Sequence, residues 1–216
     1  GKPTGEWSDI TTTSFYASHN MTAGGGGGMV MTNDQDIIKR AKVFRDWGRA
    51  LPERYEHYEG AFEERYNFSL DGIDYDGKFV FMELGYNMKA VEMQAAFGLV
   101  QLGRLPVFNR VSRENFEKLN SFFKQYEEFF VLPQQLPGAE PFWLSFPVTL
   151  KESAGLQRKD LLKFMEVNKI QTRLLFAGNI ARHPIYKKLQ NKFRIAAELD
   201  DADYIMRNTF LLACHH

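Results

Sequence analysis

The first quarter of the chain combines two strand patterns with one helix pattern. Residues 10–16 and 29–32 are short runs of β-branched, aromatic and apolar side chains, which are typical of strands. Apolar side chains then recur at helical spacing over residues 34–47, after Asn33, a residue type that favours the N-cap of a helix. The pattern predicts a strand, a glycine-rich loop, a second strand and a helix that ends near Gly48.

The rest of the chain predicts a long loop, two helices and a small mixed domain. Residues 49–85 are rich in Tyr, Glu, Asp and Gly without sustained periodicity, so we expect a loop with short strands. Apolar positions predict one helix that ends near Pro106 and a second helix over residues 108–126. Further patterns predict strands at 142–150, 171–176 and 209–214, and helices at 160–167 and 200–207. We therefore expect two domains, residues 1–106 and 107–216, the second of α+β type.

Composition and charge narrow the class of protein. The chain has 216 residues, with 27 Lys and Arg against 27 Asp and Glu, so no excess positive charge is available for a phosphate backbone or an anionic membrane. We therefore expect neither nucleic acid nor a membrane as a partner. No apolar run approaches the ~20 residues of a membrane span. Cys214 is the single cysteine, which excludes an internal disulfide and a four-cysteine metal site and suits a reducing cytoplasm.

Both ends of the chain interrupt apolar patterns. The first predicted strand lies close to Gly1, and the last is followed only by His215 and His216. This pattern predicts a piece of a longer chain, although a terminal strand within a sheet explains it as well. The two final histidines are either native or the start of a purification tag, so we assign them no metal ion.

The densest group of candidate chemical side chains lies between residues 14 and 22. It contains Ser14, His19 and several other hydroxyl and amide groups, and five glycines follow at residues 24–28. Glycines allow positive φ and leave backbone N–H groups exposed, so such a segment at the end of a strand can hold a phosphate. The alternative is an ordinary turn, with Ser and Thr as capping residues and an incidental histidine.

Three segments resemble one protein family and occur in the family's order. They are residues 14–19 (Ser-Phe-Tyr-Ala-Ser-His), residues 85–102 (beginning Gly-Tyr-Asn-Met-Lys) and residues 172–184 (Thr-Arg-Leu-Leu-Phe-Ala-Gly-Asn-Ile-Ala-Arg-His-Pro). Together they are similar to the DegT/DnrJ/EryC1/StrS sugar aminotransferase family of fold type I pyridoxal-phosphate enzymes. Residues 44–49 and 173–179 resemble more narrowly the NDP-4-keto-6-deoxyhexose 3-dehydrases of lipopolysaccharide sugar synthesis. The resemblance implies a partial α/β fold: the later part of the large cofactor-binding domain, followed by a truncated small α+β domain.

The resemblance implies a cofactor site around His19. Family members normally have a lysine there, which forms a Schiff base with the cofactor. An imidazole cannot form a stable one, so the resemblance implies pyridoxamine or pyridoxal phosphate held by non-covalent contacts, with His19 as the catalytic base. An imidazole with its usual pKa of about 6.5 exchanges protons near neutral pH. Ser14 matches the serine that binds the cofactor phosphate, and Asn87 matches an asparagine that reaches this phosphate from the partner subunit, which implies a homodimer.

The resemblance also implies a substrate, a keto-deoxysugar carried on a nucleoside diphosphate. Arg173, Asn179, Arg182 and His183 match residues that lie near the substrate in the dehydrases, and arginines there can pair with the diphosphate. The implied reaction removes the C3 hydroxyl of the sugar in the cytoplasm.

Several departures from the family pattern modify this expectation. The iron–sulfur dehydrases carry four cysteines that this chain lacks, so we expect no cluster. Asn20 stands where many relatives show a second histidine, and the glycine run lacks a common glutamate. The aspartate that pairs with the cofactor ring nitrogen would precede Gly1, so we expect an inactive fragment of an active full-length parent. Two alternatives are a sugar aminotransferase that uses another amine and a catalytically silent sugar-nucleotide-binding scaffold.

Overall fold

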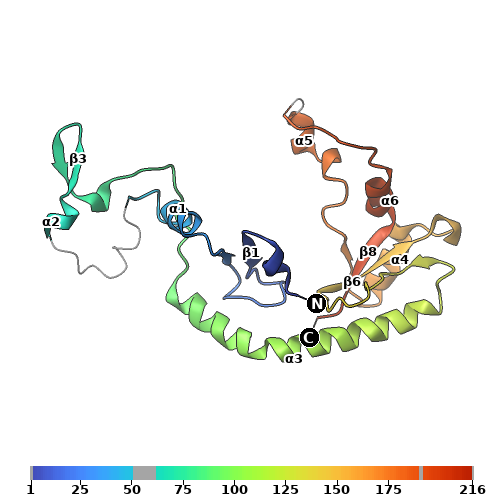
Figure 1. Cartoon of the computed structure of the whole chain (residues 1–216). Helices are drawn as coiled ribbons and strands as arrows, with labels where there is room; N and C mark the ends of the chain where they lie inside the picture. Colours follow the sequence, from blue (N-terminus) through green and yellow to red (C-terminus); the bar gives the residue numbers. More distant parts are fainter. Residues whose placement is uncertain (1, 51–61, 190–191, 216) are drawn as a thin grey trace. The chain divides into compact units, whose positions relative to one another are not determined.

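The computed structural model of the protein (Figure 1) describes residues 2–50, 62–189 and 192–215. The chain divides into two compact units, Gly1–Gly103 (unit 1) and Arg104–His216 (unit 2). Among the described residues, no helix is long and apolar enough to cross a membrane.

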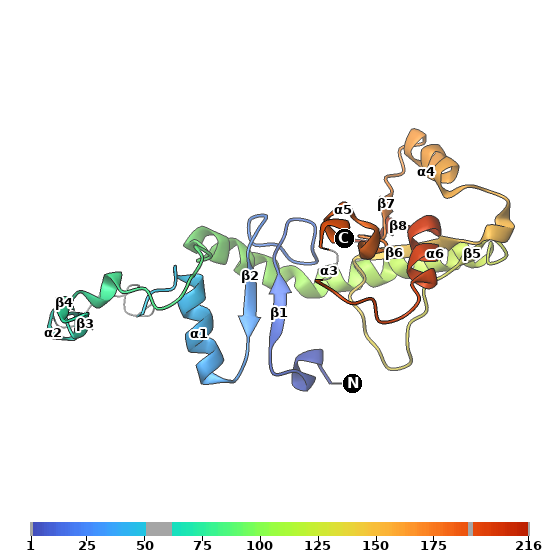
Figure 2. The same ribbon diagram turned by 90° about the horizontal axis from the view of Figure 1, so that it is seen from above.

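Unit 1 contains two short hairpins and several helices. Its elements are η1 (Thr4–Trp7), β1 (Thr11–Ser14), β2 (Gly28–Met31), α1 (Gln35–Arg45), α2 (Phe62–Arg65), β3 (Phe68–Leu70), β4 (Ile73–Tyr75) and η3 (Gly77–Phe79). β1 and β2 run antiparallel, with Ser14 opposite Gly28 (Figure 2). A Cβ atom at Gly28 would lie 2.8 Å from the Thr13 carbonyl oxygen, so glycine is required at this end of the hairpin. The two strands predicted around the glycine run are confirmed.

The helix α1 begins one residue later than predicted. Asp34, not Asn33, is the N-cap, and its carboxylate accepts hydrogen bonds from the backbone N–H groups of Asp36 (2.8 Å) and Ile37 (3.1 Å). Both residue types can cap a helix, but a carboxylate also interacts favourably with the positive end of the helix dipole. Because Asn33 and Asp34 can both act as the N-cap, the sequence alone does not decide at which residue α1 begins.

The region predicted as a long loop contains more regular structure than expected. β3 and β4 form a hairpin in which the turn residues Asp71 (φ 52°) and Gly72 (φ 85°) both have positive φ, as a type I′ turn requires. The predicted short strands are confirmed. α2 was not predicted, because four residues are too few to show a helical period. Residues 51–61 of the predicted loop lie outside the described residues.

One long helix, α3 (Glu92–Lys124), replaces the two helices predicted on either side of Pro106. The predicted helix end is wrong for an energetic reason. A proline inside a helix costs about 3 kcal/mol, whereas burial of one phenylalanine side chain contributes about 1.5–3 kcal/mol. Phe108, Phe116 and Phe123 are all buried on the turns that follow Pro106, so packing outweighs the lost hydrogen bond.

Unit 2 is an α+β unit built on a four-stranded antiparallel sheet. The strand order is β5 (Phe130–Val131), β6 (Ser145–Leu150), β8 (Thr209–Ala213) and β7 (Arg173–Leu174). Its other elements, besides the second half of α3, are η4 (Glu152–Ala154), α4 (Arg158–Val167), η5 (Ile180–Arg182), α5 (Pro184–Lys188) and α6 (Asp200–Asn208). β7 is shorter than predicted, and β5 was not predicted because two residues leave no alternation to detect.

The core of unit 2 joins α3 to one face of this sheet. Every second side chain of β6 is buried, and the residues of β8 that pair with them face the same side. The ring centroids of Phe116 on α3 and Phe146 on β6 lie 5.0 Å apart in an edge-to-face arrangement. The buried cluster consists of Phe116, Phe123, Phe146, Val148, Phe210 and Leu212.

Cys214 follows β8 and is buried beside this core. Its thiol donates a hydrogen bond to the carbonyl oxygen of Trp143 (3.3 Å), and the hydroxyl of Ser112 on α3 donates to the same oxygen. Burial raises the pKa of the Cys214 thiol to about 11. The indole of Trp143 also stacks on Phe116 with centroids 4.0 Å apart, so the segment before β6 is held against α3.

We expect Phe146→Ala to unfold unit 2 at a lower urea concentration. The side chain has 0% exposure, so its removal should lower the free energy of unfolding by about 3–5 kcal/mol, because it leaves a cavity among the aromatic rings. Urea unfolding followed by circular dichroism measures this change. Phe164→Ala on α4 is the matched control, because Phe164 is 66% exposed and should contribute less than about 0.5 kcal/mol. Equal losses in the two variants would contradict the placement of the core.

Candidate functional site

Ser14 ends β1 with an exposed side chain. Its hydroxyl oxygen accepts a hydrogen bond from the backbone N–H of Tyr16 (3.3 Å). This bond uses a lone pair of the oxygen and leaves the O–H free to donate, which is what an anionic ligand requires. The strand pairing fixes the backbone at Ser14, so the hydroxyl is a donor at a defined place in unit 1.

His19 lies beside Ser14, and the structure thus brings these two predicted site residues together. Its Nδ1 is 3.4 Å from the Ser14 carbonyl oxygen, and its ring meets that of Tyr16 edge-on with centroids 5.8 Å apart. With the proton on Nδ1, the imidazole donates to this carbonyl oxygen and keeps Nε2 as a proton acceptor. Because the side chain is exposed, Nε2 can take a proton from a bound molecule.

The loop that carries His19 is closed by the side chain of Thr22. The hydroxyl of Thr22 donates to the carbonyl oxygen of Phe15 (2.9 Å) and accepts from the backbone N–H of Gly25 (3.0 Å). The backbone N–H of Phe15 in turn donates to the carbonyl oxygen of Gly27 (2.9 Å). Both Gly25 and Gly27 have positive φ, which explains why the loop needs glycine there. In the sequence Thr22 is one of several hydroxyl residues, and no pattern marks the one that closes the loop.

Asn87 lies on a separate loop of unit 1. Its backbone forms an isolated antiparallel bridge with Asp46, and its side chain is exposed. Next to it, a Cβ atom on Gly85 would overlap the backbone nitrogen of Gly48, so two glycines permit these segments to touch. The backbone position of Asn87 is therefore fixed, while its amide side chain remains accessible to a ligand or another chain.

Two of the four predicted substrate residues are joined in unit 2 by a residue that was not predicted, Asp203 of α6. Its carboxylate accepts a hydrogen bond from the amide nitrogen of Asn179 (2.7 Å) and two from the guanidinium of Arg182. The amide oxygen of Asn179 accepts from the backbone N–H of Ala181 (3.2 Å) and so caps η5. Asp203 is 6% exposed. The sequence does not single out Asp203, because acidic residues in a first helical turn are explained equally well by the helix dipole.

The other two predicted substrate residues have different surroundings. His183 precedes α5, and its Nε2 lies 2.8 Å from the carbonyl oxygen of Ala177. Arg173 is exposed on the edge strand β7. The carboxylate of Glu166 accepts hydrogen bonds from the backbone N–H (2.6 Å) and the hydroxyl (2.8 Å) of Thr172, and these bonds lower the pKa of Glu166. The residue before Arg173 is thereby tied to α4.

A further feature of unit 2 is an open depression of about 630 Å³ at the end of α3, lined by Lys124, Glu127 and Lys151 among others. It contains none of the predicted site residues. Within residues 2–50, 62–189 and 192–215, no group of three His, Cys, Asp or Glu side chains could hold a metal ion.

Comparison with known proteins shows the family to which the whole chain is similar. Residues 1–216 match the family described as the DegT/DnrJ/EryC1/StrS aminotransferase family. The chain is 38% identical to the lipopolysaccharide biosynthesis protein RfbH of Salmonella typhimurium, and the match covers 100% of this chain and 49% of that protein. It is 34% identical to the dTDP-4-dehydro-2,6-dideoxy-D-glucose 3-dehydratase of Saccharopolyspora spinosa, with 97% of this chain and 45% of that protein covered. The chain thus spans about half the length of the curated relatives it matches.

Solved structures show the same relationship. The Escherichia coli GDP-4-keto-6-deoxy-D-mannose-3-dehydratase, solved with bound hydrated PLP, superimposes with a TM-score of 0.78 at 25% identity over 96% of this chain and 50% of that chain. The Helicobacter pylori aminotransferase PseC has the same fold, with a TM-score of 0.74 at 21% identity over 96% of this chain and 48% of that chain. These matches confirm the predicted fold class, a part of the fold type I α/β architecture.

We expect Asp203 to stabilise unit 2 at neutral pH and to lose this effect in acid. Hydrogen bonds from Arg182 and then Asn179 hold the pKa of its carboxyl well below the ordinary value of 3.8. Because the folded-state pKa is depressed, the stabilisation is complete above the ordinary pKa and is lost as the pH falls through the depressed one. Asp203→Asn should therefore lower the urea midpoint at pH 7, and its difference from the wild type should shrink from about pH 4 downward.

Urea unfolding at several pH values between neutrality and strong acid measures this difference. Asp201→Asn is the matched control, because Asp201 is exposed in the same first turn and its loss removes only the weaker interaction with the helix dipole, so it should lower the midpoint much less. A difference for Asp203→Asn that stays constant across the whole pH range would contradict the role of its ionised carboxylate.

Proposed function

Because the chain belongs to the DegT/DnrJ/EryC1/StrS aminotransferase family, we propose that it is the later half of a pyridoxamine-phosphate-dependent NDP-4-keto-6-deoxyhexose 3-dehydratase. The reaction removes the C3 hydroxyl of a sugar nucleotide in deoxysugar or lipopolysaccharide synthesis. The names of the Saccharopolyspora and Escherichia coli dehydratases support this reaction, and the name of the Salmonella protein supports the pathway. The coverage of about half of each relative supports a longer parent, which we place in the cytoplasm.

One observation carries the proposal: the side chain that lies beside Ser14 in the structure, His19, is an imidazole and not an amine. An amine at this position would bind the cofactor covalently, whereas an imidazole leaves it held by contacts and moves a proton. When bound, pyridoxamine phosphate supplies an amine for the C4 ketone and a protonated ring that accepts electrons. His19, oriented through Nδ1 by the Ser14 carbonyl oxygen, uses Nε2 to remove the proton from C4′ of the cofactor.

The residues around Ser14 fit the phosphate group of this cofactor. The Ser14 oxygen already accepts a hydrogen bond from Tyr16, so its O–H donates to the phosphate. The positive-φ glycines of the following loop keep Cβ atoms away from the ligand. Asn87 supplies an amide donor from the partner subunit.

The sugar nucleotide binds beside residues 173–183 in this proposal. Arg173 and Arg182 are exposed and pair with the diphosphate, since a guanidinium matches phosphate oxygens in geometry and charge. Asn179 is buried and bonded to Asp203, so it shapes this segment from beneath. His183 completes the group at the start of α5.

Shared active sites require a homodimer of two-domain subunits, with residues 1–106 in the cofactor domain and residues 107–216 in the small domain. Exposed apolar side chains close to Asn87 in the sequence support a subunit interface, because large apolar side chains on a surface are often covered by a partner. These side chains are Met82, Leu84, Met88, Met93 and Leu99. Residues 1–216 alone are nearly inactive in this proposal, so the tests below use the full-length parent.

We expect His19→Asn to lower the rate of dehydration by about 10²–10⁴-fold, because the proton acceptor is removed while the amide keeps a polar side chain. Turnover of a 4-keto-6-deoxy sugar nucleotide measures the rate, with an amino donor present because the reaction consumes the pyridoxamine form of the cofactor as its two-electron reductant. Cofactor absorbance after gel filtration measures retention, which should remain. Ser18→Ala, in the same loop, is the control and should leave the rate within about twofold. Full activity of His19→Asn would remove the imidazole from the mechanism. A cofactor covalently bound to the wild type would favour the aminotransferase alternative.

We expect two inactive variants to restore activity when mixed, if Asn87 serves the site of the partner subunit. His19→Asn is expected to be inactive, and a parent with Asn87→Ala should lose cofactor affinity. Mixed dimers of the two would contain one intact site and one doubly defective site. Denaturing and refolding them together should therefore recover about a quarter of wild-type activity, as random pairing of subunits predicts. No recovery would place Asn87 in its own subunit's site.

A further inference from the structure

The buried carboxylate of Asp203 organises the segment assigned to the substrate. It receives two hydrogen bonds from the guanidinium of Arg182 and one from the amide of Asn179. One side chain of α6 therefore controls two residues that are separated from it by more than twenty positions in the sequence. The bidentate pairing fixes the plane of the guanidinium as well as its position, which a single hydrogen bond would not do.

Arg182 differs from Asp203 in exposure. Its side chain is 60% exposed, whereas the side chain of Asp203 is 8% exposed. A guanidinium carries several N–H groups beyond the two that the carboxylate accepts. The pair therefore has a buried acidic half and a solvent-facing basic half. An arginine held this way loses less side-chain freedom when an oxyanion binds to its outer edge.

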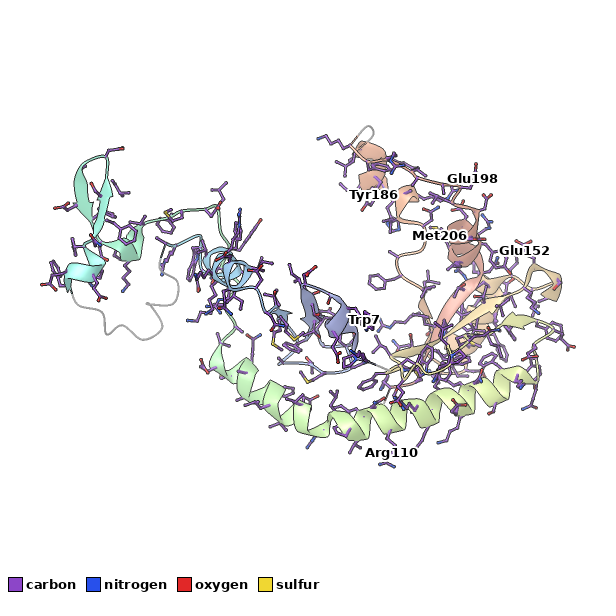
Figure 3. All side chains as sticks on the ribbon, in the orientation of Figure 1. Trp7, Arg110, Glu152, Tyr186, Glu198 and Met206 are labelled. Atoms are coloured by element: carbon purple, nitrogen blue, oxygen red, sulfur yellow. The ribbon has the colours of Figure 1, made fainter. Side chains whose placement is uncertain are left out.

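The helix that carries Asp203 is fixed at its other end by a separate contact. The guanidinium of Arg158, at the start of α4, donates to the carbonyl oxygens of Met206 (2.6 Å) and Thr209 (2.9 Å). Met206, labelled on α6 in Figure 3, also fills the space beside Gly178, where a Cβ atom would lie 2.8 Å from its Cγ. α6 thus rests on the turn that precedes Asn179, and Arg158 contacts its C-terminal end, away from Asp203.

We propose that Asp203 is a positioning residue for the substrate: it presents Arg182 to the diphosphate of the sugar nucleotide. This inference rests on the proposed function, because it assumes that residues 173–183 face the nucleotide. Asp203 itself does not touch the substrate. The carboxylate fixes the orientation of the Arg182 guanidinium. Asn179 donates to the same carboxylate and caps η5, so it holds the start of this helix next to Asp203.

The test compares Asp203→Asn with Arg158→Gln in the full-length parent. Both substitutions remove a contact of α6, but only Asp203 touches Arg182. Asp203→Asn should raise KM for the 4-keto sugar nucleotide about tenfold and change kcat less than twofold, since it weakens binding in ground and transition states alike. Arg158→Gln should lower the thermal midpoint and leave KM within about twofold. Calorimetric titration with inorganic pyrophosphate, GDP and dTDP should show the same differences: Asp203→Asn should raise Kd, and Arg158→Gln should leave Kd almost unchanged.

Two further variants separate positioning from general loss of structure. Asp203→Glu keeps the charge and should recover part of the affinity. Arg182→Lys keeps a positive charge but loses the planar guanidinium. The double variant Arg182→Lys/Asp203→Asn should bind the sugar nucleotide no more weakly than the weaker of the two single variants, because each change alone already removes the pairing of Arg182 with Asp203. Additive losses, or equal KM changes in Asp203→Asn and Arg158→Gln, would overturn the positioning role. A wild-type parent that neither binds nor converts any sugar nucleotide would instead overturn the proposed function, and the inference with it.

Discussion

The proposed chemistry depends on the two hydrogen bonds of the Thr22 hydroxyl. This hydroxyl joins the two sides of the loop between β1 and β2 by donating to Phe15 and accepting from Gly25. The loop then returns the backbone of His19 toward the end of β1, where the Ser14 carbonyl oxygen meets the imidazole. A base must be oriented before it can take a proton from a bound molecule, and here the orientation comes from backbone groups that a short hairpin already holds.

Asn179 and Arg182, in the segment of unit 2 that we propose for the substrate, are organised by a different principle. Here a buried carboxylate, instead of a backbone turn, holds the side chains. Ionic contacts of this kind are costly to bury unless each oxygen is satisfied, and Asp203 meets this condition with three hydrogen bonds. The positions of the Asn179 and Arg182 side chains therefore depend on one buried carboxylate.

The sequence predicted what depends on local chemistry and missed what depends on distant packing. The strands around the glycine run and the helix α4 follow from composition and period, and the structure has them. The end of a helix at Pro106 was expected from the proline alone, but Phe116 and Phe123, which favour a continuous α3, meet their partner Phe146 only after folding. The pairing of Asp203 with Arg182 spans 21 residues and has no local pattern. The proximity of Ser14 and His19, within one short loop, was within reach of the sequence.

The surroundings of Cys214 have a consequence for covalent reagents. A thiol is nucleophilic only as the thiolate, and burial has moved its ionisation far above neutral pH. The sulfur also donates to Trp143 within a packed region, so electrophiles reach it only when this part of unit 2 opens. We therefore expect the one cysteine of the chain to behave as a small apolar side chain and to react slowly with alkylating reagents in the folded protein.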